Sequence, residues 1–248
     1  MRNTIQLELK LAKSMMIEEF TFRNHKMAKL TRENVAKAEA MIHNDSAYIR
    51  SSDISAAPTQ KYGGSTAYWM TQLKGVLVDG IDNKSYSYEE IIKGAVEAVD
   101  RENSTHLNAD KCGRQEITER ICSFDRAELI KCLKNPDYKD MLLIREISRV
   151  TSAKKRARTN LSFASKFCHY ACFYLFEGTE FQDNYSIYDS ILKTVLVWYL
   201  DYYSLNHFDL ENYKEYREAV DSVIFASRGG ISRNGFDHLL WYFHKGRM

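Results

Sequence analysis

A lysine inside an apolar stretch is the residue of this chain best suited to nucleophilic chemistry. Lys166 lies within residues 161–176, which contain no proline, glycine or acidic residue. Phe163, Phe167 and Tyr170 recur around it at helical spacing, so the stretch is predicted to be a helix that faces the core. Because a lysine at the edge of such a stripe is partly desolvated, its pKa falls and the fraction of neutral amine rises. Neutral amine is the form that a nucleophilic lysine needs.

An aspartate that precedes the next apolar stretch is the candidate carboxylate to act together with this amine. Asp189 comes directly before an amphipathic pattern made by Ile191, Leu192, Val195 and Leu196. The pattern predicts a helix with Asp189 at its N-cap, where the helix-end amides and the helix dipole favour a negative charge. An amine beside a fixed carboxylate could attack a sugar carbon while positive charge develops on that carbon.

Two short motifs carry a resemblance to a known family. Ser162-Phe-Ala-Ser-Lys166 and Ile187-Tyr-Asp189-Ser resemble the lysine-using 8-oxoguanine branch of the helix-hairpin-helix DNA glycosylases, which are also abasic-site (AP) lyases. The resemblance implies that Lys166 is the Schiff-base nucleophile, and that Asp189 orients it and stabilises an oxocarbenium-like sugar. It covers about residues 140–245, and the segment from Phe236 to Phe243 is similar to the last helix of small bacterial members.

The chain departs from the family pattern in the hairpin. Most members carry Leu-Pro-Gly-x-Gly before the lysine, whereas residues 159–165 contain neither glycine nor proline. The archaeal members are similar in this respect and keep the lysine. Asp189 follows Lys166 by 23 residues, a longer separation than the family leads us to expect, and the polar loop 177–184 could absorb the difference.

Composition favours an all-α fold. The chain has 248 residues, of which 44% are hydrophobic, and only 2 are proline and 11 glycine. This content is sufficient for a packed core, and long helical patterns dominate between the few breakers. We find no strand-like alternation and expect helices at 3–24, 31–43, from 65 or 66, from 87, 115–122, 125–133, 137–151, 161–176, from 190, 210–225 and from 235.

The resemblance refines this fold class to a two-lobed helical bundle of the helix-hairpin-helix glycosylase type. It divides the chain into an N-terminal helical region, residues 1–113, that matches nothing in the family, and a glycosylase-like domain, residues 114–248, that holds both motifs. We expect the two parts to pack as one unit.

Charge is concentrated beside Lys166. The formal net charge is only +2, yet residues 145–170 contain seven basic residues and one acid. Such a concentration is typical of a surface that follows DNA phosphates. The candidate phosphate-binding residues are Lys154, Lys155, Arg156 and Arg158. Taken without the neighbouring lysine motif, the same run would be read as a solvated helix end.

Two aromatic residues are candidates for stacking on an extruded base. Tyr170 is one turn past Lys166, and Trp241 lies off the apolar stripe of the last predicted helix, on a face shared with Asp237 and Lys245. Flat apolar side chains suit a flipped base. Packing in the core or at its rim is the alternative for both. His169, next to Lys166, could shuttle a proton or could satisfy a hydrogen bond in the core.

The cysteines and the apolar runs indicate in which cellular compartment the protein is expected and whether it is expected to bind a metal. Five cysteines with no C-x-x-C pair indicate reduced thiols and argue against disulfides or a zinc site. The apolar run at 191–200 is too short to cross a membrane, and the N-terminus lacks a signal-peptide pattern. We therefore expect a cytoplasmic, nucleoid-associated monomer without metal or organic cofactor.

The sequence thus predicts an enzyme that acts on double-stranded DNA containing a damaged or modified base. The activity would be excision of an 8-oxoguanine-like purine through a Lys166 Schiff base, assisted by Asp189, followed by strand cleavage. One alternative is a catalytically inactive DNA-binding module on the same fold, in a defence or mobile-element system. Another is a helical protein-interaction domain that does not bind nucleic acid.

Overall fold

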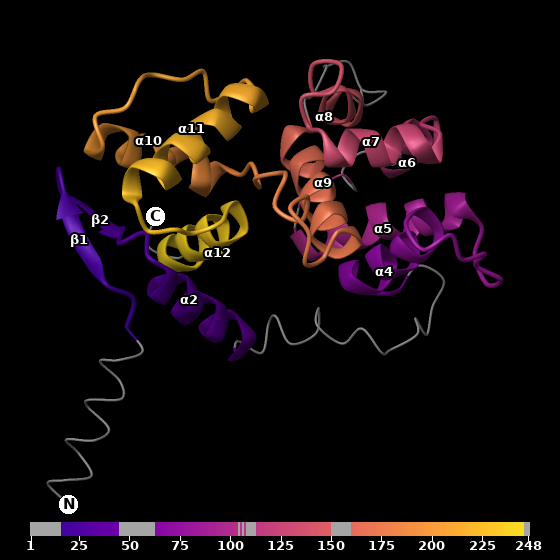
Figure 1. Ribbon diagram of the computed structural model, residues 1–248, viewed down its shortest axis with the longest axis horizontal. Coiled ribbons are helices and arrows are strands. Elements are labelled where there is room, and N and C mark those ends of the chain that lie inside the picture. Colours follow the sequence, from indigo (N-terminus) through magenta and orange to yellow (C-terminus); the bar gives the residue numbers. More distant parts are fainter. Residues whose placement is uncertain are drawn as a thin grey trace, which may run out of the picture.

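The described part of the chain is mostly helical, with ten helices and one two-stranded sheet (Figure 1). This computed structural model describes residues 16–44, 63–103, 105, 107, 113–149 and 160–245. The predicted all-α class is confirmed at this level. None of the helices within these ranges is long and apolar enough to span a membrane.

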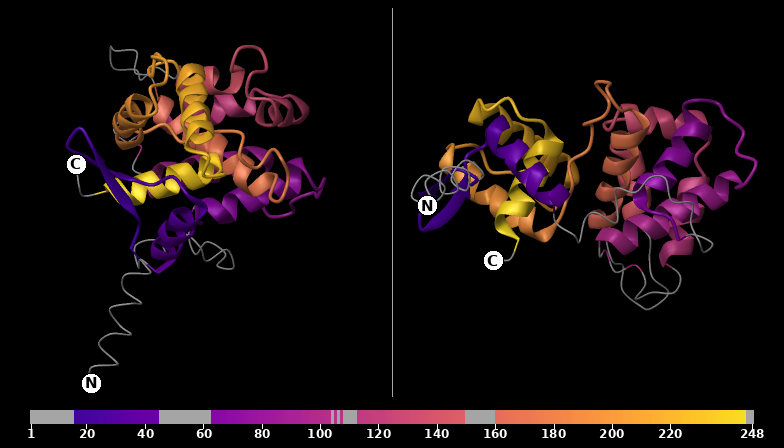
Figure 2. Two further views of the ribbon diagram at one scale, coloured as in Figure 1. Left: turned by 60° about the vertical axis from the view of Figure 1, so that its left-hand side comes forward. Right: turned by 90° about the horizontal axis from the view of Figure 1, so that it is seen from below.

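The helices form two lobes. The first lobe combines the two ends of the described chain: β1 (Glu19–Phe22), β2 (His25–Ala28), α2 (Arg32–Asn44), α10 (Ser190–Tyr202), α11 (Tyr213–Ser227) and α12 (Arg233–His244). The second lobe is continuous in sequence: α4 (Thr66–Leu77), α5 (Tyr88–Asn103), α6 (Gly113–Cys122), α7 (Arg126–Lys134), α8 (Leu142–Ser148) and α9 (Leu161–Leu175). Figures 1 and 2 show the lobes side by side, joined by the segment that follows α9.

Residue 113, the predicted boundary between the N-terminal region and the glycosylase-like domain, lies at the start of α6, within the second lobe. Helices α5 and α6 pack on each other across that position, whereas α2 packs on α12 at the other end of the sequence. Both lobes have large, fully buried aromatic side chains. Trp69, Phe163 and Phe167 fill the second lobe, and Tyr199 and Phe236 fill the first.

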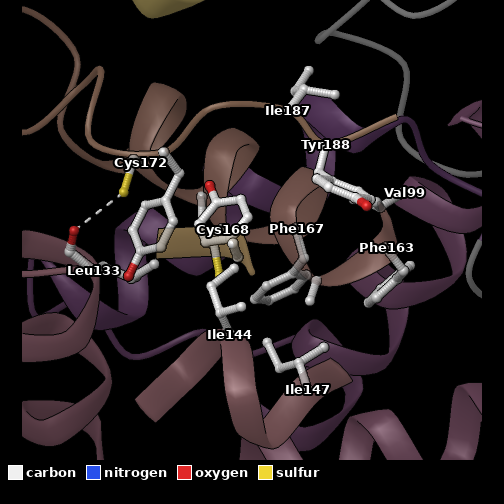
Figure 3. Packing of buried hydrophobic residues seen from close by; sticks show 14 of the residues in the cluster. Val99, Leu133, Ile144, Ile147, Phe163, Phe167, Cys168, Cys172, Ile187 and Tyr188 are labelled. Atoms are coloured by element: carbon white, nitrogen blue, oxygen red, sulfur yellow. Dashed lines mark hydrogen bonds between the residues drawn. The ribbon is translucent and has the colours of Figure 1, made fainter. Parts of the chain in front are cut away.

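Helix α9 is the central element of the second lobe, in contact with α4, α5, α7 and α8. Its predicted core-facing character is confirmed, because Phe163 and Phe167 are fully buried. Figure 3 shows both rings within the cluster of buried residues that also contains Val99 of α5 and Ile147 of α8. The site residue Lys166 therefore lies on a helix that is surrounded by other helices.

The predicted helix at 3–24 is wrong over the residues that the structure describes, since Glu19–Phe22 and His25–Ala28 pair as an antiparallel hairpin. The expectation that the chain has no strand is wrong for the same reason. Arg23 and Asn24 have positive φ angles of 45° and 68°, as a two-residue hairpin turn requires. The strands are short, and the ring of Phe20 packs 4.7 Å from that of Tyr202.

The start of one helix also differs from the prediction. Helix α8 begins at Leu142 instead of residue 137, because Lys139, Asp140 and Met141 all have left-handed backbone conformations, which a right-handed helix excludes. Near the end of α5, Asp100 is only 3% exposed, and its carboxylate accepts a hydrogen bond of 2.7 Å from the Nε of Arg114.

Candidate active site

Lys166 is buried in α9, and among the described residues its amine has no charged partner in contact. The residue is 9% exposed. Burial lowers the pKa of the Lys166 amine, and the negative charge of Asp189 acts in the opposite direction and raises it. Within the described ranges, the side chain of Lys166 makes no hydrogen bond or ion pair. The amine is therefore desolvated and lies within the electrostatic influence of Asp189.

Asp189 occupies the N-cap of α10, as the sequence predicted. Its backbone is extended, with φ −141° and ψ 170°, and its Oδ1 accepts a hydrogen bond of 2.8 Å from the amide of Leu192. The side chain is half-buried. Because α10 belongs to the first lobe and α9 to the second, Lys166 and Asp189 come from different lobes.

The residues immediately before Asp189 are hydrogen-bonded to both lobes. The amide of Tyr188 donates to the Oγ of Ser165 on α9 at 3.0 Å. The amide of Ile187 donates to Oδ2 of Asp237 on α12 at 2.8 Å. The segment that leads to Asp189 is therefore attached to α9 on one side and to α12 on the other.

Two tyrosines of α11 fix the carbonyl groups of the same segment. The hydroxyl of Tyr213 donates to the carbonyl of Ser186, and that of Tyr216 donates to the carbonyl of Ile187, each at 2.8 Å. Both tyrosine side chains are buried. The backbone ahead of Asp189 is thus held by α9, α11 and α12, and these two carbonyl groups and two amides are satisfied away from water.

His169 has a structural role. Its Nδ1 is 2.8 Å from the carbonyl oxygen of Tyr185, and its Nε2 is 3.1 Å from Oδ1 of Asn234. Burial lowers the pKa of His169 to about 4. With both ring nitrogens engaged, this histidine satisfies core hydrogen bonds, which is the second of the two readings that the sequence left open.

The two candidate base-stacking residues come from different lobes. Tyr170 of α9 is half-buried, and its hydroxyl donates to Oδ1 of Asn103 at 3.0 Å. Trp241 of α12 is also half-buried, and the Nζ of Lys245 lies 4.3 Å from the centroid of its ring. Asp237, expected on the same face as Trp241, is instead fully buried at 2% exposure.

The four candidate phosphate-binding residues, Lys154, Lys155, Arg156 and Arg158, lie outside the described residues. The basic lead-in to them is described and is partly neutralised. Arg145 and Arg149 approach the carboxylate of Glu146 at 3.7 and 3.9 Å. Five of the seven basic residues of the stretch 145–170 come after Arg149.

Sequence reasoning missed Ser165 and Asp237. Ser165 was part of the lysine motif but had no role, and its position next to Lys166 was the available signal. Asp237 stood among the apolar residues of the last helix, where an acid is unusual. Neither signal indicates that Ser165 and Asp237 bind the amides of Tyr188 and Ile187, because folding alone brings these residues together.

Comparisons with protein-family models, with curated proteins and with solved structures find no match to this chain. In the described ranges, no group of three or more histidine, cysteine, aspartate or glutamate side chains is arranged to hold a metal ion.

Proposed function

We propose that this protein is a DNA N-glycosylase with AP lyase activity, in which Lys166 is the nucleophile and Asp189 assists it. The observation that carries the proposal is a buried lysine whose pKa is lowered by desolvation and which feels the charge of a helix-capping aspartate from the other lobe. Perturbed amines of this kind are concentrated at functional sites. The motif resemblance at the same two residues supplies the reaction class.

The chemistry proceeds in two stages. The neutral amine of Lys166 attacks the anomeric carbon of the nucleotide, the bond from that carbon to the base nitrogen breaks, and the base leaves with a proton. Asp189 stabilises the positive charge that develops on the sugar as this bond breaks. The bond from the anomeric carbon to the ring oxygen then breaks, the ring oxygen takes the second proton of the amine, and the nitrogen forms an imine with the opened sugar. Removal of a proton from the adjacent carbon expels the 3′ phosphate and cleaves the strand.

The substrate would be double-stranded DNA from which a damaged purine such as 8-oxoguanine is extruded. Lys154, Lys155, Arg156 and Arg158 would bind the phosphates, which fix the position of the protein on the duplex. Tyr170 and Trp241 would stack on the extruded base. No metal or organic cofactor is part of this proposal.

Borohydride trapping tests the proposal directly. The protein is mixed with duplex oligonucleotides that contain 8-oxoguanine or an abasic site, and borohydride reduces any imine to a stable covalent adduct. We expect the natural protein to form the adduct and Lys166→Ala to form none. Lys214→Ala, which removes an exposed lysine of α11, is the matched control and should keep full adduct yield.

The alternatives predict different results. An adduct that persists in Lys166→Ala would show that another amine is the nucleophile. Absence of an adduct together with salt-sensitive gel retardation would favour the catalytically inactive DNA-binding module. Absence of both would favour a protein-interaction domain.

A further inference from the structure

The backbone just ahead of Asp189 is held by two side chains that the proposed chemistry does not use. Ser165 accepts the amide hydrogen of Tyr188, and Asp237 accepts that of Ile187. Both side chains are buried, Ser165 completely and Asp237 at 2% exposure. The two amides belong to the residues one and two positions before Asp189, so their anchoring fixes where the carboxylate can lie.

Ser165 links the nucleophile to this segment through a single helix. It is the neighbour of Lys166 in α9, and its hydroxyl also donates to the carbonyl of Ser162 at 3.0 Å. The hydroxyl therefore has its proton directed into α9 and its lone pair toward Tyr188. Because a helix is rigid over one turn, this bond sets the distance from the Lys166 backbone to the residue before Asp189.

Asp237 sits in an environment that disfavours a carboxylate. Burial raises its pKa well above the usual range for aspartate, and the charges of Asp183 and Asp189 act in the same direction. The backbone amide of Ile187 lowers it in part, as does the more distant Arg233. Oδ1 of Asp237 has no hydrogen-bond partner in the part of the chain that the structure describes. A buried acid with one unpaired oxygen is costly, and the hydrogen bond that this side chain makes is the one to Ile187.

The peptide group between Ser186 and Ile187 is bound on both sides, since the Tyr213 hydroxyl donates to its carbonyl while Asp237 accepts from its amide. The next peptide group is bound in the same way, by the Tyr216 hydroxyl at its carbonyl and by Ser165 at its amide. A peptide held in this way cannot rotate without breaking a buried hydrogen bond. Asp189 follows two residues later, where its own side chain caps α10.

We propose that Ser165 and Asp237 are positioning residues, which hold the Ile187–Tyr188 backbone so that the carboxylate of Asp189 lies close to the amine of Lys166. This inference rests on the proposed function, because it assigns these residues to the same site. In this inference neither Ser165 nor Asp237 contacts DNA. Removal of either side chain would leave the amine of Lys166 in place and displace the carboxylate of Asp189.

The pH at which Lys166 loses its proton reports the position of Asp189 without any DNA. Competitive labelling with acetic anhydride over a pH series, read at the Lys166 peptide by mass spectrometry, gives this midpoint. Because the charge of Asp189 raises the pKa of Lys166, Asp189→Asn should move the midpoint to lower pH. Asparagine is also a good N-cap, so this variant should keep α10 intact.

We expect Ser165→Ala and Asp237→Ala to shift the midpoint in the same direction as Asp189→Asn. Neither should shift it further when combined with Asp189→Asn, since the charge they position is then absent. Asp237→Asn keeps an oxygen that can accept from Ile187 and should leave the midpoint where the natural protein has it. Ser162→Ala, one turn earlier on α9, is the matched control and should also cause no shift.

Turnover gives a second readout. At saturating DNA, Ser165→Ala should lower kcat by about 10–100-fold with little change in KM, because misplacing a reacting group costs that much while DNA binding is unaffected. Thermal unfolding shows whether each variant is folded. If Asp237→Ala fails to fold, Ser165→Ala and its double variant with Asp189→Asn still decide the question.

The inference is overturned if Asp189→Asn moves the midpoint but Ser165→Ala leaves it unchanged. It is also overturned if the shifts of Ser165→Ala and Asp189→Asn add fully in the double variant. A shared shift without any borohydride adduct supports the positioning role and removes the glycosylase proposal. An adduct on Lys166 without a shared shift supports the glycosylase proposal and removes the positioning role of Ser165 and Asp237.

Discussion

The amine of Lys166 lies in a setting that opposes its charged form, and this has a consequence for folding as well as for chemistry. In the folded protein the pKa of Lys166 is lowered by burial, whereas in the unfolded chain the amine is solvated. Between the two pKa values the unfolded chain therefore holds more protons than the folded one, so stability rises with pH in that window. At lower pH the full cost of burying the charged amine is present.

Replacing Lys166 by a neutral side chain of similar length should therefore stabilise the protein. We expect Lys166→Met to raise the free energy of unfolding at neutral pH by about 1 kcal/mol, which corresponds to a rise in Tm of ~2–4 °C. The gain should shrink as the pH approaches the pKa of an unfolded lysine. Differential scanning calorimetry over a pH series measures this. Lys214→Met, at an exposed position, should change neither Tm nor its pH dependence.

Single residues were predictable where the information is local. The N-cap role of Asp189 follows from the apolar pattern after it and is confirmed by the bond to Leu192. The roles of Ser165 and Asp237 could not be predicted, because their partners are backbone amides more than twenty residues away in sequence. A backbone amide carries no signature in the amino-acid sequence.

Elements with strong periodicity were predicted well, and those that depend on turn geometry were not. Helix α9 has aromatic residues at helical spacing and no breaker, and it is found at Leu161–Leu175. The β1–β2 hairpin was missed because its turn is formed by Arg23 and Asn24, without a glycine to mark it. Helix α8 starts late for the same reason, since Lys139 to Met141 adopt left-handed conformations without glycine.

The basic segment between α8 and α9 is the element on which DNA affinity should depend. Each phosphate contact releases counterions, so the logarithm of affinity falls with the logarithm of salt concentration. We expect Lys154→Ala and Arg156→Ala each to reduce the magnitude of this slope by about 1. Fluorescence anisotropy with a labelled duplex at several salt concentrations measures it. Lys214→Ala, on α11 of the first lobe, should leave the slope unchanged. Unaltered slopes in the first two variants would show that this segment does not bind DNA.

At the scale of the molecule, the first lobe is assembled from segments at opposite ends of the chain. The hydroxyl of Tyr199 on α10 donates to the carbonyl of Ala28 on β2 at 2.6 Å, in a fully buried position. Helix α2 packs on α12. Sequence patterns gave no basis for this pairing, because amphipathic faces indicate that an element is covered but not which element covers it.

Removal of the Tyr199 hydroxyl should weaken the junction between these segments. Tyr199→Phe leaves the carbonyl of Ala28 without its partner, so we expect a loss of about 1–3 kcal/mol in the free energy of unfolding. Urea denaturation followed by circular dichroism measures this. Tyr202→Phe removes a hydroxyl from a side chain that is 42% exposed and should be nearly neutral. Equal losses of unfolding free energy in the two variants would show that the buried hydrogen bond from Tyr199 to Ala28 contributes nothing particular to stability.

The order in which these segments are synthesised limits when the first lobe can fold. Helices α4 to α9 are contiguous and could pack as they emerge, whereas α2 must wait for α12, which follows all the other described helices in the chain. Asp237 lies on α12, and its contact with Ile187 is one of those that hold the backbone ahead of Asp189. Nascent chains in which Lys166 has already emerged would therefore lack the bond from Ile187 to Asp237 until α12 has followed, so the backbone ahead of Asp189 gains its last support late in folding.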